Sequence, residues 1–215
     1  MVQCNRDIQL ARVVKDCYNR GDSFISVALL VSMNQPQVSL FFIALLPPPE
    51  VQEIATKIKL EFAEIYNSCA ALKSPPHVTL QPPFRWNLGQ LPDLERCLEE
   101  FARWHAPIPL ILQNFAAFKP RVIYINVQKT PELLTLQKRL LQQLESSLNI
   151  IDNASKSRAF APHLTVGFRD LTKDNFWKAW SKYANQELFF EVMIDQITLL
   201  IHNGKHWEIY RQFSL

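Results

Sequence analysis

His77-Val78-Thr79-Leu80 and His163-Leu164-Thr165-Val166 are two copies of one pattern, His-apolar-Thr-apolar. The residue frequencies of this chain predict roughly 0.04 such tetrapeptides by chance, so two copies indicate a duplication. Successive side chains of a β-strand point to opposite faces. If both copies are strands, the histidine and threonine of each share one face, and the two apolar residues pack into the core.

The segments around the two copies repeat as well. Before each copy comes a long stretch whose apolar residues have helical spacing. Near the end of the chain, Asn203-Gly204 predicts the turn of a β-hairpin. Strands are expected at 38–46, 77–80, 108–115, 121–127, 161–168, 196–202 and 205–213, and helices at 50–70, 91–104, 130–148 and 172–184, with a loop at 150–160. This order predicts an α+β fold, a bilobal internal duplication in which two antiparallel sheets face a central cleft and the helices lie outside.

Composition is ordinary for a soluble globular protein, with 48% hydrophobic and 20% charged residues and a net charge of +3. The chain has only four glycines and no GxGxxG or GxxxxGK[ST] pattern, so no cofactor is expected on a glycine-rich phosphate loop. No apolar run approaches the ~20 residues of a membrane span. Four scattered cysteines favour a reduced, cytoplasmic setting, and we expect a monomer.

The N-terminal part of the chain differs from the rest. Residues 1–36 mix charges with weak helical periodicity, and Met33-Asn34-Gln35-Pro36 resembles the start of a new segment. The apolar stretch 24–31 is too short for a signal peptide and has no cleavage pattern. We expect 1–36 to be a peripheral leader and 37–215 to be a single bilobal domain.

The residue types of the repeated pattern suit phosphodiester chemistry. If the two lobes face each other, His77 and His163 converge on one cleft together with Thr79 and Thr165. An imidazole titrates near pH 6.5, so one histidine can act as base while the other acts as acid. Threonine hydroxyls can hydrogen-bond phosphate oxygens as charge builds on them. A zinc ion would be short of ligands here, because no Cys, Asp or Glu stands at matching spacing.

Each copy is followed by a Phe-Arg pair, Phe84-Arg85 and Phe168-Arg169. An arginine at the mouth of a cleft could hold phosphate, and a phenylalanine could stack on a base. The alternatives are core packing for the phenylalanines and solvated strand ends for the arginines, and Arg169 is the better candidate of the two. The polar, basic segment 152–158 is either a closing loop or a plain surface connection.

The sequence resembles the two-histidine phosphoesterase superfamily, in its 2′-5′ RNA ligase-like branch of RNA cyclic phosphodiesterases. The resemblance rests on Pro76-His77-Val78-Thr79-Leu80, on Pro162-His163-Leu164-Thr165-Val166 and on the intervening stretch 118–124. The resemblance covers about residues 37–215. It implies a bilobal duplication with the active site between the lobes, and acid–base roles for the two histidines. It also implies phosphate contacts from the two threonines and hydrolysis of 2′,3′-cyclic phosphates without a metal. The diproline Pro82-Pro83 and the placement of Arg169 depart from the commonest family pattern.

The sequence therefore predicts a cytoplasmic, metal-independent phosphodiesterase without a cofactor, which opens 2′,3′-cyclic phosphate termini of RNA or nucleotides. His163 is assigned to deprotonate water and His77 to protonate the leaving ribose oxygen. Two alternatives stay open: a 2′-5′ RNA ligase, which needs the same acid, base and phosphate clamp, and a non-catalytic nucleotide- or RNA-binding module.

Overall fold

The computed structural model describes residues 37–152 and 158–215. The expected leader, residues 1–36, lies outside the described residues, as does most of the basic segment 152–158. Among the helices of the described part, none is long and apolar enough to cross a membrane.

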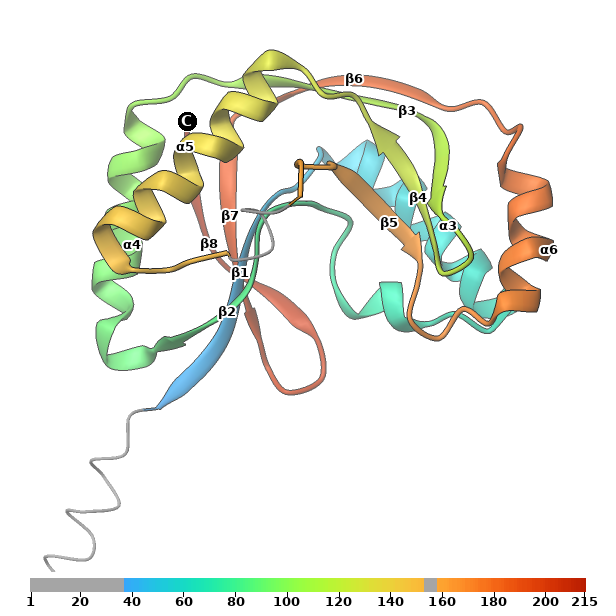
Figure 1. Cartoon of the computed structure of the whole chain (residues 1–215), viewed down its shortest axis with the longest axis horizontal. Coiled ribbons are helices and arrows are strands. Elements are labelled where there is room, and N and C mark those ends of the chain that lie inside the picture. Colours follow the sequence, from blue (N-terminus) through green and yellow to red (C-terminus); the bar gives the residue numbers. More distant parts are fainter. Residues whose placement is uncertain (1–36, 153–157) are drawn as a thin grey trace, which may run out of the picture. The chain divides into compact units, whose positions relative to one another are not determined.

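Two four-stranded antiparallel sheets form the centre of the fold (Figure 1). Sheet A has the order β2 (Val78–Asn87), β1 (Val38–Leu45), β7 (Gln196–His202), β8 (Trp207–Ser214), and sheet B the order β5 (His163–Gly167), β4 (Val122–Val127), β3 (Ile108–Phe118), β6 (Phe189–Ile194). The motif strands β2 and β5 are edge strands, and they contact each other where the sheets meet. The predicted α+β class with two antiparallel sheets is confirmed.

The duplication is visible in the two long helices. Both α3 (Pro49–Tyr66) and α5 (Pro131–Leu148) have 18 residues, carry proline in the first turn, and end at an asparagine in the left-handed region. The φ angles of Asn67 and Asn149 are 52° and 54°. Proline fits the first helical turn because its missing N–H would have no partner there, and asparagine tolerates the left-handed cap better than most residues. Each strand-helix-strand-helix unit then closes with a shorter helix, α4 (Leu91–Arg103) or α6 (Lys173–Tyr183).

The long helices are exchanged between the sheets. Helix α3 connects two strands of sheet A but packs with α6 against sheet B (Figure 1). Helix α5 connects two strands of sheet B, and it packs with α4 against sheet A while also contacting β3 of sheet B. Phe62 of α3 lies so close to Gly167 of β5 that a Cβ there would be 2.5 Å from its ring. On the other side, the Gln137 amide of α5 donates to the Leu80 carbonyl of β2 at 3.4 Å. Most buried apolar residues of both lobes consequently form one continuous core, and Phe42, Ala44 and Leu200 form a smaller separate cluster.

Two strands differ from the prediction. Strand β2 runs through the diproline to Asn87 instead of ending at Leu80, and its pairing with β1 has two irregularities. Proline lacks an N–H, which an edge strand tolerates because one of its sides has no partner strand. Strand β6 was not predicted; it alternates exposed and less exposed residues and pairs with β3 at the far edge of sheet B.

Candidate active site

The two motif histidines are oriented in the same way. Nδ1 of His77 lies 2.7 Å from the carbonyl oxygen of Pro75, and Nδ1 of His163 lies 2.7 Å from that of Ala161. A carbonyl oxygen can only accept, so in each ring Nδ1–H donates and holds the tautomer. The Nε2 atom of each neutral ring is thereby left with a free lone pair.

Both histidines line one cavity of about 630 Å³, together with Thr79 and Thr165. The two threonines are half-buried. Within residues 37–152 and 158–215, neither threonine hydroxyl has a hydrogen-bond partner, so both can donate to a ligand. The structure thus brings the four residues of the repeated pattern together, as strand alternation and the duplication predicted.

Each imidazole lies next to aromatic rings on one side: one ring beside His77 and two beside His163. The ring centroid of His77 is 4.8 Å from that of Phe42 on β1. The centroid of His163 is 5.2 Å from those of Phe118 and Tyr124, on the neighbouring strands β3 and β4. These rings keep water from one side of each imidazole and fix its orientation.

Burial lowers the pKa of both histidines. The pKa of His77 falls to about 4, chiefly because burial penalises the charged ring, although the hydrogen bond to Pro75 opposes this; the nearby charges of Lys59 and His163 lower it further. The pKa of His163 is also lowered by burial, against the effect of its bond to Ala161. Both rings are therefore neutral at pH 7 in the free protein. An anion between them would favour the protonated form.

Phe168 and Arg169 line the same cavity. Arg169 has a φ of 60°, in the left-handed region that non-glycine residues rarely adopt, and its guanidinium lies 5.2 Å from the centroid of the Phe168 ring. This corner turns the chain from the end of β5 toward α6 and places a permanent positive charge at the cavity.

Asp170 holds this corner against the connection between α3 and β2. Its carboxylate accepts hydrogen bonds from the Ser68 hydroxyl at 2.8 Å, the Cys69 N–H at 2.8 Å and the Ala70 N–H at 2.9 Å. Ser68 is fully buried. Three bonds to one carboxylate stabilise the strained turn at Arg169, which lies next to it in the chain.

Phe84 and Arg85 are not among the residues that line the cavity. The pairing of β2 with β1 shifts in register between Gln81 and Phe84, so that Phe84 lies opposite Phe41 with ring centroids 6.3 Å apart and packs on the core. Arg85 is exposed farther along the strand, and Pro83 lines the cavity instead. The diproline therefore breaks the equivalence of the two Phe-Arg pairs.

The β7–β8 hairpin adds cavity residues that sequence reasoning missed. His202, Lys205, His206 and Trp207 all line the cavity, although the sequence predicted only a hairpin turn here. Trp207 packs on Phe42, with ring centroids 4.6 Å apart, and on His202 at 4.9 Å. The sequence predicts the hairpin correctly, but only the pairing of β7 with β1 brings its turn to the histidines.

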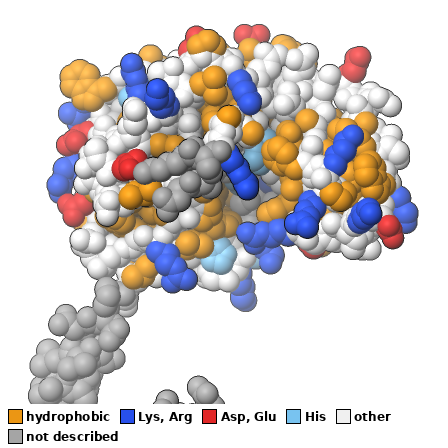
Figure 2. Space-filling model, in the orientation of Figure 1, with side chains coloured by type: hydrophobic (Ala, Val, Ile, Leu, Met, Phe, Trp, Pro, Cys, Tyr) orange, Lys and Arg blue, Asp and Glu red, His pale blue; other side chains and the backbone are white. Residues whose placement is uncertain are grey.

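The charged side chains that line the cavity are all positive. Lys73, Arg169 and Lys205 line it, and its lining among the described residues includes no Asp or Glu. Figure 2 shows Lys and Arg side chains gathered around the hollow on this face of the molecule. Such a lining attracts anionic ligands.

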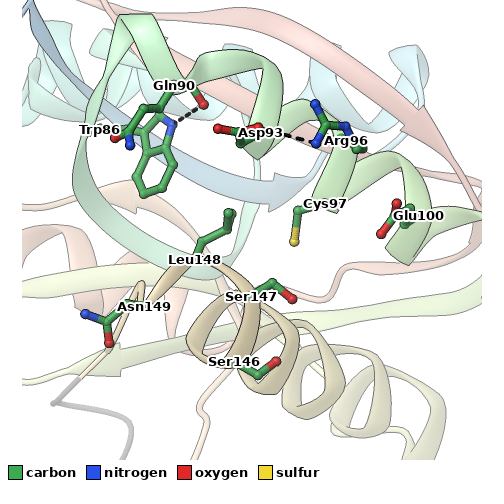
Figure 3. Close-up of a pocket in the computed structure, with 10 residues that line it drawn as sticks. All are labelled: Trp86, Gln90, Asp93, Arg96, Cys97, Glu100, Ser146, Ser147, Leu148 and Asn149. Carbon is green, nitrogen blue, oxygen red and sulfur yellow. Dashed lines mark hydrogen bonds and ion pairs between the residues drawn. The ribbon is translucent and has the colours of Figure 1, made fainter.

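A second large groove, of about 610 Å³, lies between α4 and the end of α5 (Figure 3). Its polar groups are largely paired with each other: the Trp86 indole N–H donates to the Gln90 carbonyl at 2.9 Å, and Arg96 lies 3.4 Å from Asp93. Burial raises the pKa of the Cys97 thiol, which keeps it protonated and unreactive at neutral pH. None of the predicted site residues lines this groove.

The fold and the cavity together define a two-histidine phosphoesterase-type enzyme. The chain belongs to the 2′-5′ RNA ligase superfamily, whose family model matches residues 47–206. A protein from Geobacillus thermodenitrificans (strain NG80-2), provisionally named phosphoesterase, is 35% identical over 176 residues, which are 80% of this chain and 93% of the relative. A relative with a similar provisional name from Geobacillus kaustophilus (strain HTA426) is 32% identical over the same shares.

Solved structures show the same fold. The crystal structure of E. coli LigT complexed with 3′-AMP matches with a TM-score of 0.59 at 19% identity, over 83% of this chain and 99% of that one. The crystal structure of TT0787 of Thermus thermophilus matches with a TM-score of 0.57 at 19% identity, over 82% of this chain and 97% of that one.

Proposed function

We propose that this protein is a metal-independent phosphodiesterase that hydrolyses 2′,3′-cyclic phosphate termini of RNA or nucleotides. The observation that carries the proposal is the pair of Nε2 atoms, each freed by an Nδ1 bond to a carbonyl, in one cationic cavity. The provisional name of the Geobacillus relatives supports a phosphoesterase. The 3′-AMP in the LigT complex is a nucleoside monophosphate of the type that opening a cyclic phosphate releases.

In the proposed reaction, one histidine removes a proton from water as the water oxygen attacks phosphorus. The bond between phosphorus and one ribose oxygen breaks, and the other histidine gives its proton to that oxygen. The hydroxyls of Thr79 and Thr165 donate to the non-bridging oxygens, where negative charge builds. The product is a 2′- or 3′-phosphomonoester, and the two histidines end with their protonation states exchanged.

The pKa order supports a particular division of roles. His77 has a pKa of about 4, lowered chiefly by burial and further by the nearby Lys59, so it is the ring that stays neutral in mildly acidic solution. When the two histidines together hold one proton, that proton is on His163. We therefore assign the base to His77 and the acid to His163, the reverse of the assignment made from the sequence.

The proposal predicts a bell-shaped pH dependence of kcat/KM with its maximum below pH 6.5. Activity requires His77 neutral, which is lost as the pH falls through about 4, and His163 protonated, which is lost as the pH rises through its lowered pKa. Initial rates at constant ionic strength, on adenosine 2′,3′-cyclic phosphate, measure the profile. A rate that rises to a plateau above pH 7 would contradict this assignment.

The function itself is tested with EDTA present, on adenosine 2′,3′-cyclic phosphate and on an RNA that ends in a cyclic phosphate. The expected result is conversion of at least one of them to a phosphomonoester. Joining of two RNA fragments through a 2′-5′ linkage, with no hydrolysis, would favour the ligase alternative. Binding of both ligands without turnover would favour the non-catalytic module.

A further inference from the structure

A second cavity of about 320 Å³ adjoins the active-site cavity. Helix α3 supplies Thr56 and Lys59, the segment 72–76 forms one wall, and the β7–β8 hairpin supplies His206 and Trp207. Lys73, Ser74, His206 and Trp207 line both cavities, so the two share this wall. The described residues that line the second cavity include no Asp or Glu.

Lys59 is the unusual residue of this cavity. It is only 2% exposed, and its ammonium donates to the Ser74 carbonyl at 3.1 Å. That bond uses one of the three donors of an ammonium group. Burial lowers the pKa of Lys59 to about 7. A buried cation is ordinarily paired with an anion, because removing it from water is costly.

The geometry points to a second phosphate subsite: we propose that the ammonium of Lys59, a residue that lines this cavity, binds a further phosphate group of the nucleotide whose cyclic phosphate lies between His77 and His163. The inference rests on the proposed function. Lys73 lines both cavities and can serve both phosphates. The substrate class is thereby a nucleotide that carries a second phosphate, such as a 5′-phosphorylated nucleoside 2′,3′-cyclic phosphate.

A second phosphate would give the buried ammonium of Lys59 an anionic partner. An anion beside Lys59 raises the pKa of its ammonium and holds the proton there. Lys59, which titrates near neutrality without the ligand, would then stay protonated in an ion pair with the phosphate. A charge-assisted hydrogen bond of this kind contributes about tenfold to a hundredfold in affinity.

Calorimetric titration of the full chain with adenosine 3′,5′-bisphosphate and with adenosine 3′-monophosphate tests the inference. The wild type should bind the bisphosphate about tenfold more tightly or better. Lys59→Met keeps the length of the side chain but removes its charge, and should reduce this preference to about twofold or less. Lys57→Met is the matched control: Lys57 lies on the same helix, is exposed, and pairs with Glu53 at 2.7 Å, so its variant should keep the wild-type preference.

Equal binding of the two ligands by the wild type, or an unchanged preference in Lys59→Met, would overturn the proposal. NMR of the lysine Cε–H groups in the wild type provides a measurement that needs no variant: the Lys59 resonance should titrate at higher pH with the bisphosphate than with the monophosphate. An equal effect of inorganic phosphate would show a free-anion site and would also overturn it. Binding needs no turnover, so a Lys59-dependent preference in a chain that hydrolyses no cyclic phosphate would overturn only the proposed function.

Discussion

Substitution of His77 or His163 by alanine is expected to lower kcat/KM for adenosine 2′,3′-cyclic phosphate by about 10²–10⁴-fold. Each ring contributes one proton transfer through its free Nε2, and a positioned acid or base contributes rate factors of this size. His105→Ala is the matched control, because its Nδ1 also bonds to a carbonyl, that of Phe101 at 2.7 Å, but the residue lies outside the active-site cavity.

The two variants should differ on an activated substrate. A 4-nitrophenyl phosphodiester loses its leaving group without a proton, so it needs the base but not the acid. Loss of the acid His163 should therefore cost at least tenfold less on this substrate than on the cyclic phosphate, whereas loss of His77 should cost about the same on both. The opposite pattern would show that His163, and not His77, is the general base. Near-full activity of either alanine variant on the cyclic phosphate would refute the two-histidine mechanism.

Gly167→Ala is expected to destabilise the fold by about 1–3 kcal/mol, as overpacking of a filled core does. The new Cβ would lie 2.5 Å from Cδ1 and 2.6 Å from Cε1 of Phe62, a fully buried side chain of α3. The thermal midpoint should fall by about 2–12 °C in a chain of this size, which differential scanning calorimetry measures.

Gly89→Ala is the control for this substitution, since its nearest neighbour is the Asn87 Oδ1 at an ordinary 3.4 Å. The control should shift the midpoint by a degree or two at most. If both variants have the same thermal midpoint as the wild type, α3 packs less tightly on β5 than the structure indicates.

The helices and seven of the eight strands in the described part of the chain could be predicted from the sequence, although β2 continues to Asn87 beyond its expected end at Leu80. The apolar residues of the helices recur at helical spacing, and proline stands in the first turn of both α3 and α5. The end of α3 at Tyr66 comes before the expected residue 70. His77, Thr79, His163 and Thr165 could be placed together because a strand puts alternate residues on one face and the pattern occurs twice.

The remaining site residues depend on pairing between distant segments. Phe84 is turned to the core by a shift in strand register at the diproline, which the Phe-Arg repeat does not reveal. Lys205 and Trp207 reach the cavity only because β7 pairs with β1, at the opposite end of the chain. Strand β6 is stabilised mainly by its pairing with β3, so its short sequence alone did not distinguish it from a connection.

The exchange of α3 and α5 has a consequence for symmetry. One strand-helix-strand-helix unit alone would leave part of its own sheet uncovered, because one of the two helices that pack on each sheet comes from the other unit. Two identical units could exchange these helices in a twofold dimer, and the two histidines of such a dimer would have equal pKa values. Joining the units in one chain removes that constraint. The two halves can then diverge, so that Lys59 lies near His77 and lowers its pKa, while no such lysine acts on His163 within the described residues.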